Sequence, residues 1–222
     1  MLRLASAIVT VFVLGMTASP VSAATITLLS GGGEMWVGGA AIGGGAGTTV
    51  VIDPHPAWKT PGAAQWVSYA DTGYDGALLT LPNGVNTVFT VSESFLAGAG
   101  SILNMKIWAD DTARVLIDGV EIIPANFSQG TCAAGSIGCE PNEFGAIDHV
   151  FGTGGAHTVA FEVFQVGTGL DTKSNPFGLL YDGTVDTVDD QRSAPEPGTM
   201  ALFGLGLVAV ARRMRRTSGR PS

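Results

Sequence analysis

The fold is indicated most clearly by residues 101–123, which read SILNMKIWADDTARVLIDGVEII. Every second residue from Leu103 to Ile107 is apolar, and polar residues stand between them. This period of two is typical of a half-buried antiparallel strand. The pair Asp118-Gly119 then separates two short apolar runs. It predicts a two-residue hairpin, because a type I′ turn needs a positive φ at both positions.

Similar runs, separated by Gly, Pro and Asp, recur along the middle of the chain. Many short strands with turn signals between them predict a sandwich or a barrel. We expect one all-β domain over residues 24–188, a jelly-roll-like antiparallel β-sandwich. Residues 31–47 hold nine glycines, and we expect a loop or an irregular edge there. The candidate strands are 24–29, 34–37, 48–52, 64–69, 77–81, 86–92, 101–109, 113–117, 120–123, 146–151, 156–166, 177–181 and 184–188.

Charge is unevenly distributed over the 222 residues. The stretch 24–194 carries 18 acidic and 5 basic residues, a net charge of −13, while the other basic residues and the long apolar runs lie at the two ends. No basic stripe is present to meet phosphates, so the composition excludes a nucleic-acid-binding protein. The β-rich acidic middle also excludes a multi-span membrane protein and a disordered chain.

The N-terminus has the three parts of a secretory signal peptide. Arg3 is followed by an apolar run over 4–16 and then by small residues. We predict a signal helix within residues 1–23, with cleavage between Ala23 and Ala24. The Sec translocon and a signal peptidase would then be partners; the alternative is a membrane anchor that is retained.

The C-terminus also has three parts, which follow a linker at 189–194. A Pro-Glu-Pro triplet at 195–197 precedes an apolar run at about 198–211, where we expect a transmembrane helix; a basic cluster at 212–216 and a tail at 217–222 follow. By the positive-inside rule the basic cluster stays in the cytoplasm, so the acidic domain lies outside the inner membrane. The residues that define this signal are Pro195, Glu196, Pro197 and Gly198, then Arg212, Arg213, Arg215 and Arg216.

This C-terminal pattern resembles the PEP-CTERM sorting signal of Gram-negative bacteria. The resemblance implies an exosortase as partner, a membrane-embedded protease-transpeptidase that recognises the tail and cuts near the triplet. It also implies a precursor anchored in the inner membrane, and then a mature protein at the cell surface or in a biofilm matrix. The alternative is a tail anchor that is never cut.

The middle of the chain bears a looser resemblance to jelly-roll sugar-binding modules, which include the galactose-binding-like folds and the protective-antigen-type lectin domain. It rests on the segments 108–111, 115–119 and 155–163, and 175–181 resembles the closing strand of many proteins with an exosortase signal. The resemblance supports the sandwich more than any ligand.

Cys132 and Cys139 are the two cysteines of the chain. An exported protein enters an oxidising compartment, where an even pair indicates a disulfide. A metal site and two free thiols are the alternatives.

Three aspartates, Asp110, Asp111 and Asp118, lie around the predicted hairpin. Carboxylates in a loop are ligands that calcium prefers, but the spacing is not that of an EF-hand. Turn formation by solvated aspartates is the favoured interpretation.

Four aromatic residues surrounded by turn residues are candidates for stacking on sugar rings: Trp58, Trp66, Tyr69 and Tyr74. Core packing is the commoner use of such side chains. No zinc-protease, redox or nucleophile-elbow motif is present, and no pair of glutamates is distinguished by its surroundings.

The sequence thus favours an exported, non-enzymatic surface or matrix protein without a catalytic site. A carbohydrate-binding module for exopolysaccharide, assisted by calcium or not, is the alternative, and a secreted hydrolase is the third hypothesis.

Overall fold

The computed structural model describes residues 24–76, 86–128, 137–166 and 175–188. Strands are the dominant element in these ranges, with a single 3-10 turn, η1 (Ala40–Ile42). The strands are β1 (Ala24–Leu29), β2 (Met35–Gly38), β3 (Ala46–Thr48), β4 (Val50–Val51), β5 (Val67–Ser68), β6 (Phe89–Ala97), β7 (Ile102–Asp110), β8 (Thr112–Ile117), β9 (Val120–Ile123), β10 (Gly145–Val150), β11 (Gly155–Phe164) and β12 (Gly178–Thr187).

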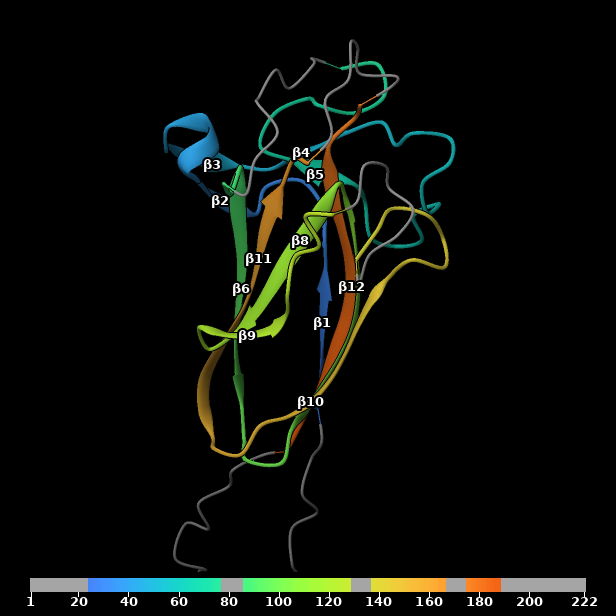
Figure 1. The fold of residues 1–222 in the computed structure, drawn as a ribbon. Helices are drawn as coiled ribbons and strands as arrows, with labels where there is room; N and C mark the ends of the chain where they lie inside the picture. Colours follow the sequence, from blue (N-terminus) through green and yellow to red (C-terminus); the bar gives the residue numbers. More distant parts are fainter. Residues whose placement is uncertain (1–23, 77–85, 129–136, 167–174, 189–222) are drawn as a thin grey trace, which may run out of the picture. The chain divides into compact units, whose positions relative to one another are not determined.

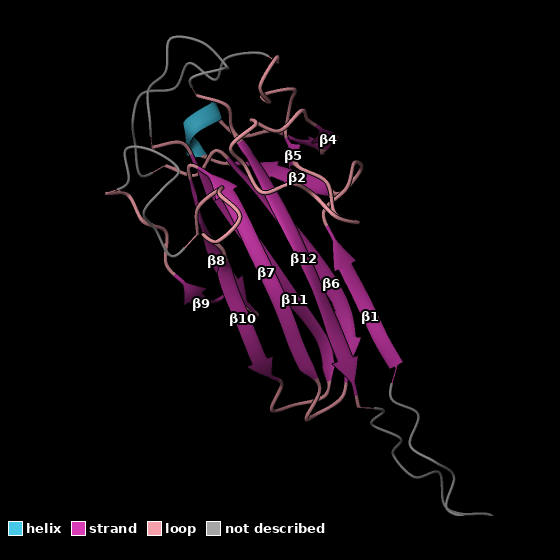
Figure 2. Ribbon diagram, turned by 90° about the vertical axis from the view of Figure 1, so that its right-hand side faces the viewer, coloured by secondary structure: helices cyan, strands magenta, loops and turns pink. Residues whose placement is uncertain are grey.

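These strands form two six-stranded sheets, which Figures 1 and 2 show from two sides. The first sheet has the order β10-β7-β12-β5-β4, and β1 also pairs with β12; the second has the order β3-β2-β6-β11-β8-β9. Each pairing between described strands is antiparallel. The prediction of an all-β antiparallel sandwich is therefore confirmed.

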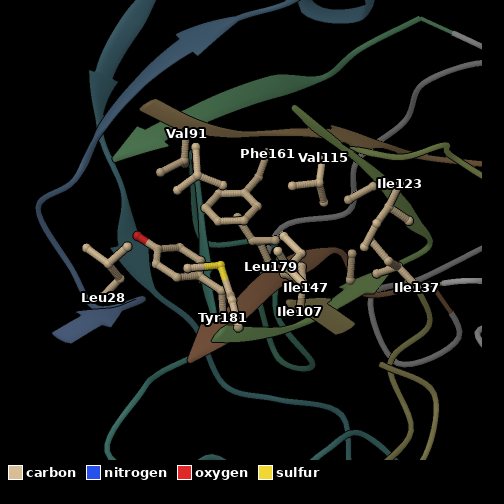
Figure 3. Close-up of a cluster of buried hydrophobic side chains, with 14 of the residues drawn as sticks. Leu28, Val91, Ile107, Val115, Ile123, Ile137, Ile147, Phe161, Leu179 and Tyr181 are labelled. Carbon is tan, nitrogen blue, oxygen red and sulfur yellow. The ribbon is translucent and has the colours of Figure 1, made fainter. Parts of the chain in front are cut away.

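The main core lies between the two sheets. Inward residues alternate along the strands, and the ring of Phe161 on β11 stacks on that of Tyr181 on β12, with 4.5 Å between centroids and 20° between planes. Figure 3 shows this pair at the centre of the buried cluster. Since Phe161 and Tyr181 come from opposite sheets, the stack joins the two layers.

A second apolar cluster covers the other face of the first sheet. Leu180 and Trp108 are paired neighbours on β12 and β7, and their side chains point away from the core that holds Leu179 and Tyr181. Trp58 and Trp66 lie in the segment between β4 and β5, Trp66 directly before β5, and their side chains pack onto Leu180 and Trp108. The first sheet is thus buried on both faces around Trp108 and Leu180.

The hairpin prediction is confirmed. Asp118 has φ 50° and Gly119 has φ 78°, and they connect β8 to β9 in an antiparallel pair. One other prediction needs correction, because the runs 177–181 and 184–188 form one strand, β12. The glycine-rich segment 31–47 contains β2, η1 and most of β3. Since β3 is an edge strand of the second sheet, this agrees with the expected irregular edge and with the candidate strand 34–37.

The two ends of the described domain lie side by side. In the pair β1–β12, Ala24 is opposite Thr187 and Leu29 is opposite Asp182. The stretch Ser22–Asp190 forms one compact unit. The predicted signal helix, the predicted transmembrane helix and the candidate strand at 77–81 lie outside the described residues. Within the described ranges, no helix has the length and apolar character needed to cross a membrane.

Candidate functional site

A pair of adjacent carboxylates stands where the chain crosses from one sheet to the other. β7 of the first sheet ends at Asp110, and β8 of the second sheet begins at Thr112, so Asp111 is the connecting residue. Asp110 is 6% exposed and Asp111 is 4% exposed. The peptide bond between them is cis. Two acidic side chains are therefore held together in a largely buried position.

Asp110 is held by an indole. Its Oδ2 atom accepts a hydrogen bond of 2.8 Å from Nε1 of Trp58, 52 residues earlier in the chain. Burial raises the pKa of the Asp110 carboxyl well above its ordinary value, and the neighbouring Asp111 raises it further, while the hydrogen bond from Trp58 acts in the opposite direction. The negative charge on this carboxyl is thus costly at this position.

Asp111 is held by the end of β11 and the residues after it. Its Oδ2 atom accepts hydrogen bonds from Nε2 of Gln165, at 2.8 Å, and from the backbone N–H of Val166, at 2.7 Å. The same Gln165 amide also donates to Oδ1 of Asn175, at 2.9 Å. Gln165 and Asn175 are both buried. The site therefore combines two carboxylates with two side-chain amides.

The side chains of this group carry several oxygen atoms. Carboxylate and amide oxygens are ligands that calcium prefers, and a bound cation would compensate the buried negative charge. The N–H groups of Trp58, Gln165 and Val166 are neutral, so these three contacts orient the carboxylates without neutralising them.

The predicted grouping of Asp118 with Asp110 and Asp111 is wrong. Asp118 follows β8, while Asp110 and Asp111 precede it, and a strand of this length separates its ends by about 20 Å. Asp118 instead accepts a hydrogen bond from the backbone N–H of Thr158, and its Oδ2 atom lies 2.7 Å from Nδ1 of His157. Over the described residues, no group of three or more His, Cys, Asp or Glu side chains is placed to hold a metal ion.

The four aromatic candidates do not form one open platform. Trp58 is 4% exposed and Trp66 is 1% exposed, and their rings pack against each other at 4.2 Å in the second cluster. The expectation that these two rings stack on a sugar is therefore wrong, because neither face is open to solvent.

The two tyrosines are half-buried and lie in different surroundings. Tyr69 packs edge-on against Trp36, with 5.7 Å between centroids, and burial raises the pKa of its hydroxyl. Tyr74 packs edge-on against His55, at 5.1 Å. Sequence reasoning missed the roles of Gln165 and Asn175. Gln165 lies near the end of the alternating run 156–166, but Asn175 follows the polar residues 171–174, so no local signal marks it.

Cys139 is buried in the second cluster, and no described cysteine is a free thiol. Its expected partner Cys132 lies outside the described residues, so the Cys132–Cys139 disulfide stays a prediction. The sorting residues 195–198 and 212–216 also lie outside the described residues. Of the two residues at the predicted signal cleavage site, Ala23 lies outside them and Ala24 begins β1.

The comparison with protein families gives one match. Residues 193–216 match the PEP-CTERM protein-sorting motif. The resemblance stated from the sequence is therefore confirmed for this segment, and the motif indicates export to a surface or extracellular location. No curated protein matches the chain.

Four solved chains are similar to part of this chain, and three of them are described in turn. A family 35 carbohydrate binding module from Clostridium thermocellum is 9% identical, with a TM-score of 0.36, over 73% of this chain and 99% of that one. A cycloisomaltooligosaccharide glucanotransferase from Paenibacillus sp., complexed with cycloisomaltoheptaose, is 14% identical, with a TM-score of 0.27, over 61% of this chain and 16% of that one. A GH31 alpha-xylosidase from Xanthomonas citri is 11% identical, with a TM-score of 0.34, over 78% and 19%.

Proposed function

We propose that this chain is the precursor of an exported, non-enzymatic protein of the cell surface or extracellular matrix, which an exosortase cuts at its C-terminal signal. The single observation that carries the proposal is the match of residues 193–216 to the sorting motif. The order of parts supports it: a signal-peptide pattern at 1–23, a compact β-sandwich, a Pro-Glu-Pro triplet, an apolar run and an arginine cluster.

The arginine cluster offers a test of sorting. Replacing Arg212, Arg213, Arg215 and Arg216 by Ala removes the charge that keeps the end of the apolar run on the cytoplasmic side. We expect the uncut precursor to accumulate in the producing cells, and the mature form to disappear from the surface fraction, both seen on immunoblots. Arg220→Ala, which lies outside the motif, is the control. Normal processing of the fourfold variant would count against the proposal.

A second candidate function for the domain is calcium-assisted carbohydrate binding. It is favoured by the buried pair Asp110 and Asp111 beside the amides of Gln165 and Asn175. Asp110, Asp111 and Asn175 would supply oxygen ligands to the calcium ion. The ion would supply compensation of the two negative charges and an electrophilic centre for sugar hydroxyl groups. The chain's own contribution is to hold the carboxylates in place through Trp58, Gln165 and Val166.

Thermal unfolding with calcium and with a chelator tests the cation. We expect calcium to raise the melting temperature of the unsubstituted protein, because a ligand that binds only the folded state stabilises it. The shift should be lost in Asp111→Asn and kept in Asp148→Asn, which changes an exposed carboxylate on β10. A glycan array with and without chelator then tests the sugar. An unchanged melting temperature in all samples argues against calcium, and an array without retained glycans argues against sugar binding.

A further inference from the structure

One end of the sandwich differs from the rest of the domain in its chemistry. The turn between β6 and β7 and the turn between β10 and β11 lie at this end, where the chain also enters at Ala24 and leaves at Val188. We call residues 96–101, residues 150–156 and Val188 the terminal rim. Figures 1 and 2 show both turns at the same end of the sheets as the start of β1 and the end of β12.

Strand register places these parts together. Ile102 pairs with both Val150 and Asp186, and Ala24 pairs with Thr187, all in the first sheet. Hydrogen bonds then link the turns to one another. The N–H of Val188 donates to Oγ of Ser101 at 2.8 Å, and the N–H of Gly100 donates to the carbonyl oxygen of Phe151 at 2.7 Å. The chain is therefore fixed to the rim as far as Val188.

The rim is apolar and uncharged. Its two turns read LAGAGS and VFGTGGA, without a single charged residue, in a domain region whose net charge is −13. Three aliphatic side chains of the rim are exposed, Leu96 at 71%, Val150 at 59% and Val188 at 40%. They come from three different parts of the chain. The opposite end is charged, since the segment between β4 and β5 and the residues after β5 carry Asp53, Lys59, Asp71 and Asp75.

Two acidic side chains near the rim have partners among the described residues. Oδ2 of Asp118 lies 2.7 Å from Nδ1 of His157, and Asp186 accepts a hydrogen bond of 2.9 Å from the hydroxyl of Thr25. The two turns of the rim therefore bring no charged side chain of their own to a negatively charged surface, unlike the segments at the opposite end.

We propose that the terminal rim rests on the phospholipid surface while the precursor is anchored. The proposal rests on the proposed function, in which the C-terminal signal holds the chain in the membrane. Only nine residues, 189–197, separate Val188 from the apolar run at about 198–211. Even fully extended they span about 30 Å, so the rim is the end of the sandwich that the tether keeps nearest to the bilayer. Exposed aliphatic side chains gain free energy when they enter the lipid interface.

This orientation has a consequence for the rest of the domain. Asp110 is the last residue of β7 and Asp111 follows it, at the end of the strand opposite to Ile102. A strand of this length spans about 25–30 Å. The carboxylate pair therefore lies at the end of the sandwich farther from the membrane before the chain is cut.

Depth-dependent fluorescence quenching tests the contact. The full chain is reconstituted in vesicles of phosphatidylethanolamine and phosphatidylglycerol, some of which carry a nitroxide at the headgroup or upper acyl chain. A bimane label is placed at Ala99→Cys in the rim, or at Gly62→Cys, an exposed position at the other end, as the matched control. The unsubstituted chain, treated with the same label, serves as the blank for Cys132 and Cys139.

We expect the lipid nitroxides to quench the label at Ala99→Cys and not the label at Gly62→Cys. Adding Leu96→Asp and Val150→Asp should abolish the quenching at Ala99→Cys. Adding Val37→Asp, which changes an exposed valine on β2, should leave it intact. Melting temperatures of all variants show whether each one is folded.

Two results would overturn the proposal. Equal, weak quenching at both labels would mean that the tether leaves the rim in water. A label at Ala99→Cys that is shielded from water-soluble quenchers but not reached by lipid nitroxides would mean that another protein chain covers the rim. Neither result depends on cleavage of the chain. A failure of the proposed sorting would be seen in a different measurement, as a precursor that stays uncut when an exosortase is supplied.

Discussion

Ala24 and Thr187 lie opposite each other in the antiparallel pair β1–β12, and the hydroxyl of Thr187 donates a hydrogen bond of 2.8 Å to the carbonyl oxygen of Ala24. The first strand after the predicted signal cleavage site therefore pairs with the last strand before the sorting signal. Since β12 also pairs with β7 and β5, the first sheet is complete only when the C-terminal strand is in place. This pairing is what brings Ala24 and Thr187, near the two ends of the described domain, to one end of the sandwich.

The stack of Phe161 on Tyr181 predicts a large loss of stability when it is removed. Both side chains are completely buried. Phe161→Ala should lower the free energy of unfolding by about 3–5 kcal/mol, as large-to-small changes in a core do. Ser92→Ala, which changes an exposed residue on the neighbouring β6, should stay within about 0.5 kcal/mol. Urea denaturation followed by fluorescence measures both, and a small effect of Phe161→Ala would show that the two sheets do not depend on this contact.

The ion pair of Asp118 and His157 predicts a loss of stability in acid. Slight burial raises the pKa of Asp118, but hydrogen bonds from His157 and from the N–H of Thr158 outweigh it and hold this pKa below its ordinary value. A carboxylate with a lowered pKa stabilises the folded state above the unfolded pKa of about 4, and this contribution is lost as the pH falls below that value.

The melting temperature of the unsubstituted protein should therefore fall more steeply below about pH 4 than that of Asp118→Asn. Asparagine is a suitable replacement because it also tolerates the positive φ of this position. His157→Gln should flatten the same part of the curve. Parallel curves for all three proteins would contradict this role for Asp118.

Alanine substitution at Gly39, in the glycine-rich segment, and at Gly62, in the loop before β5, should affect stability very differently. A Cβ atom at Gly39 would lie 2.1 Å from the backbone oxygen of Thr87, whereas one at Gly62 would meet nothing within 4 Å. Gly39→Ala should destabilise by about 1–3 kcal/mol through overpacking, and Gly62→Ala should be nearly neutral. If chemical denaturation finds both variants equally stable, then the β2–η1 region does not pack as described.

The predicted disulfide can be measured directly. Alkylation of the exported, unfolded protein without reductant should add no mass, and alkylation after reduction should add two groups, at Cys132 and Cys139. Reduction should also lower stability by about 2–3 kcal/mol, because the bond closes a short loop in the unfolded chain. Two groups added before reduction would show that the thiols are free.

The hairpin and the alternating strands could be predicted because their signals are local. Positive φ at Asp118 and Gly119, and the alternation along β7 and β11, depend on neighbouring residues only. The break predicted between 181 and 184 was wrong for a physical reason. Asp182 faces solvent, as its place in the alternation requires, and Gly183 lets the backbone approach β7, where a Cβ atom would lie 2.8 Å from the carbonyl oxygen of Asn104.

The candidate site depends on contacts that no local pattern reveals. Trp58 and Asp110 are 52 residues apart, and Gln165 and Asp111 are 54 residues apart. The turn residues around Trp58 suggested exposure, but the loop folds back onto the sheet and buries the ring. β2 was predicted at 34–37, but its pairing of Trp36 with Val91, far along the chain, was not, because no local pattern reveals the partner of a strand.

The central claim is that the chain is a precursor that is trimmed at both ends. Intact mass measurement and terminal peptide sequencing of the protein from the surface fraction of producing cells test it most directly. We predict a mature chain that begins at Ala24 and ends at or close to the triplet Pro195-Glu196-Pro197, without the apolar run and the arginine cluster. A surface protein whose sequence continues intact to Ser222 would contradict the account.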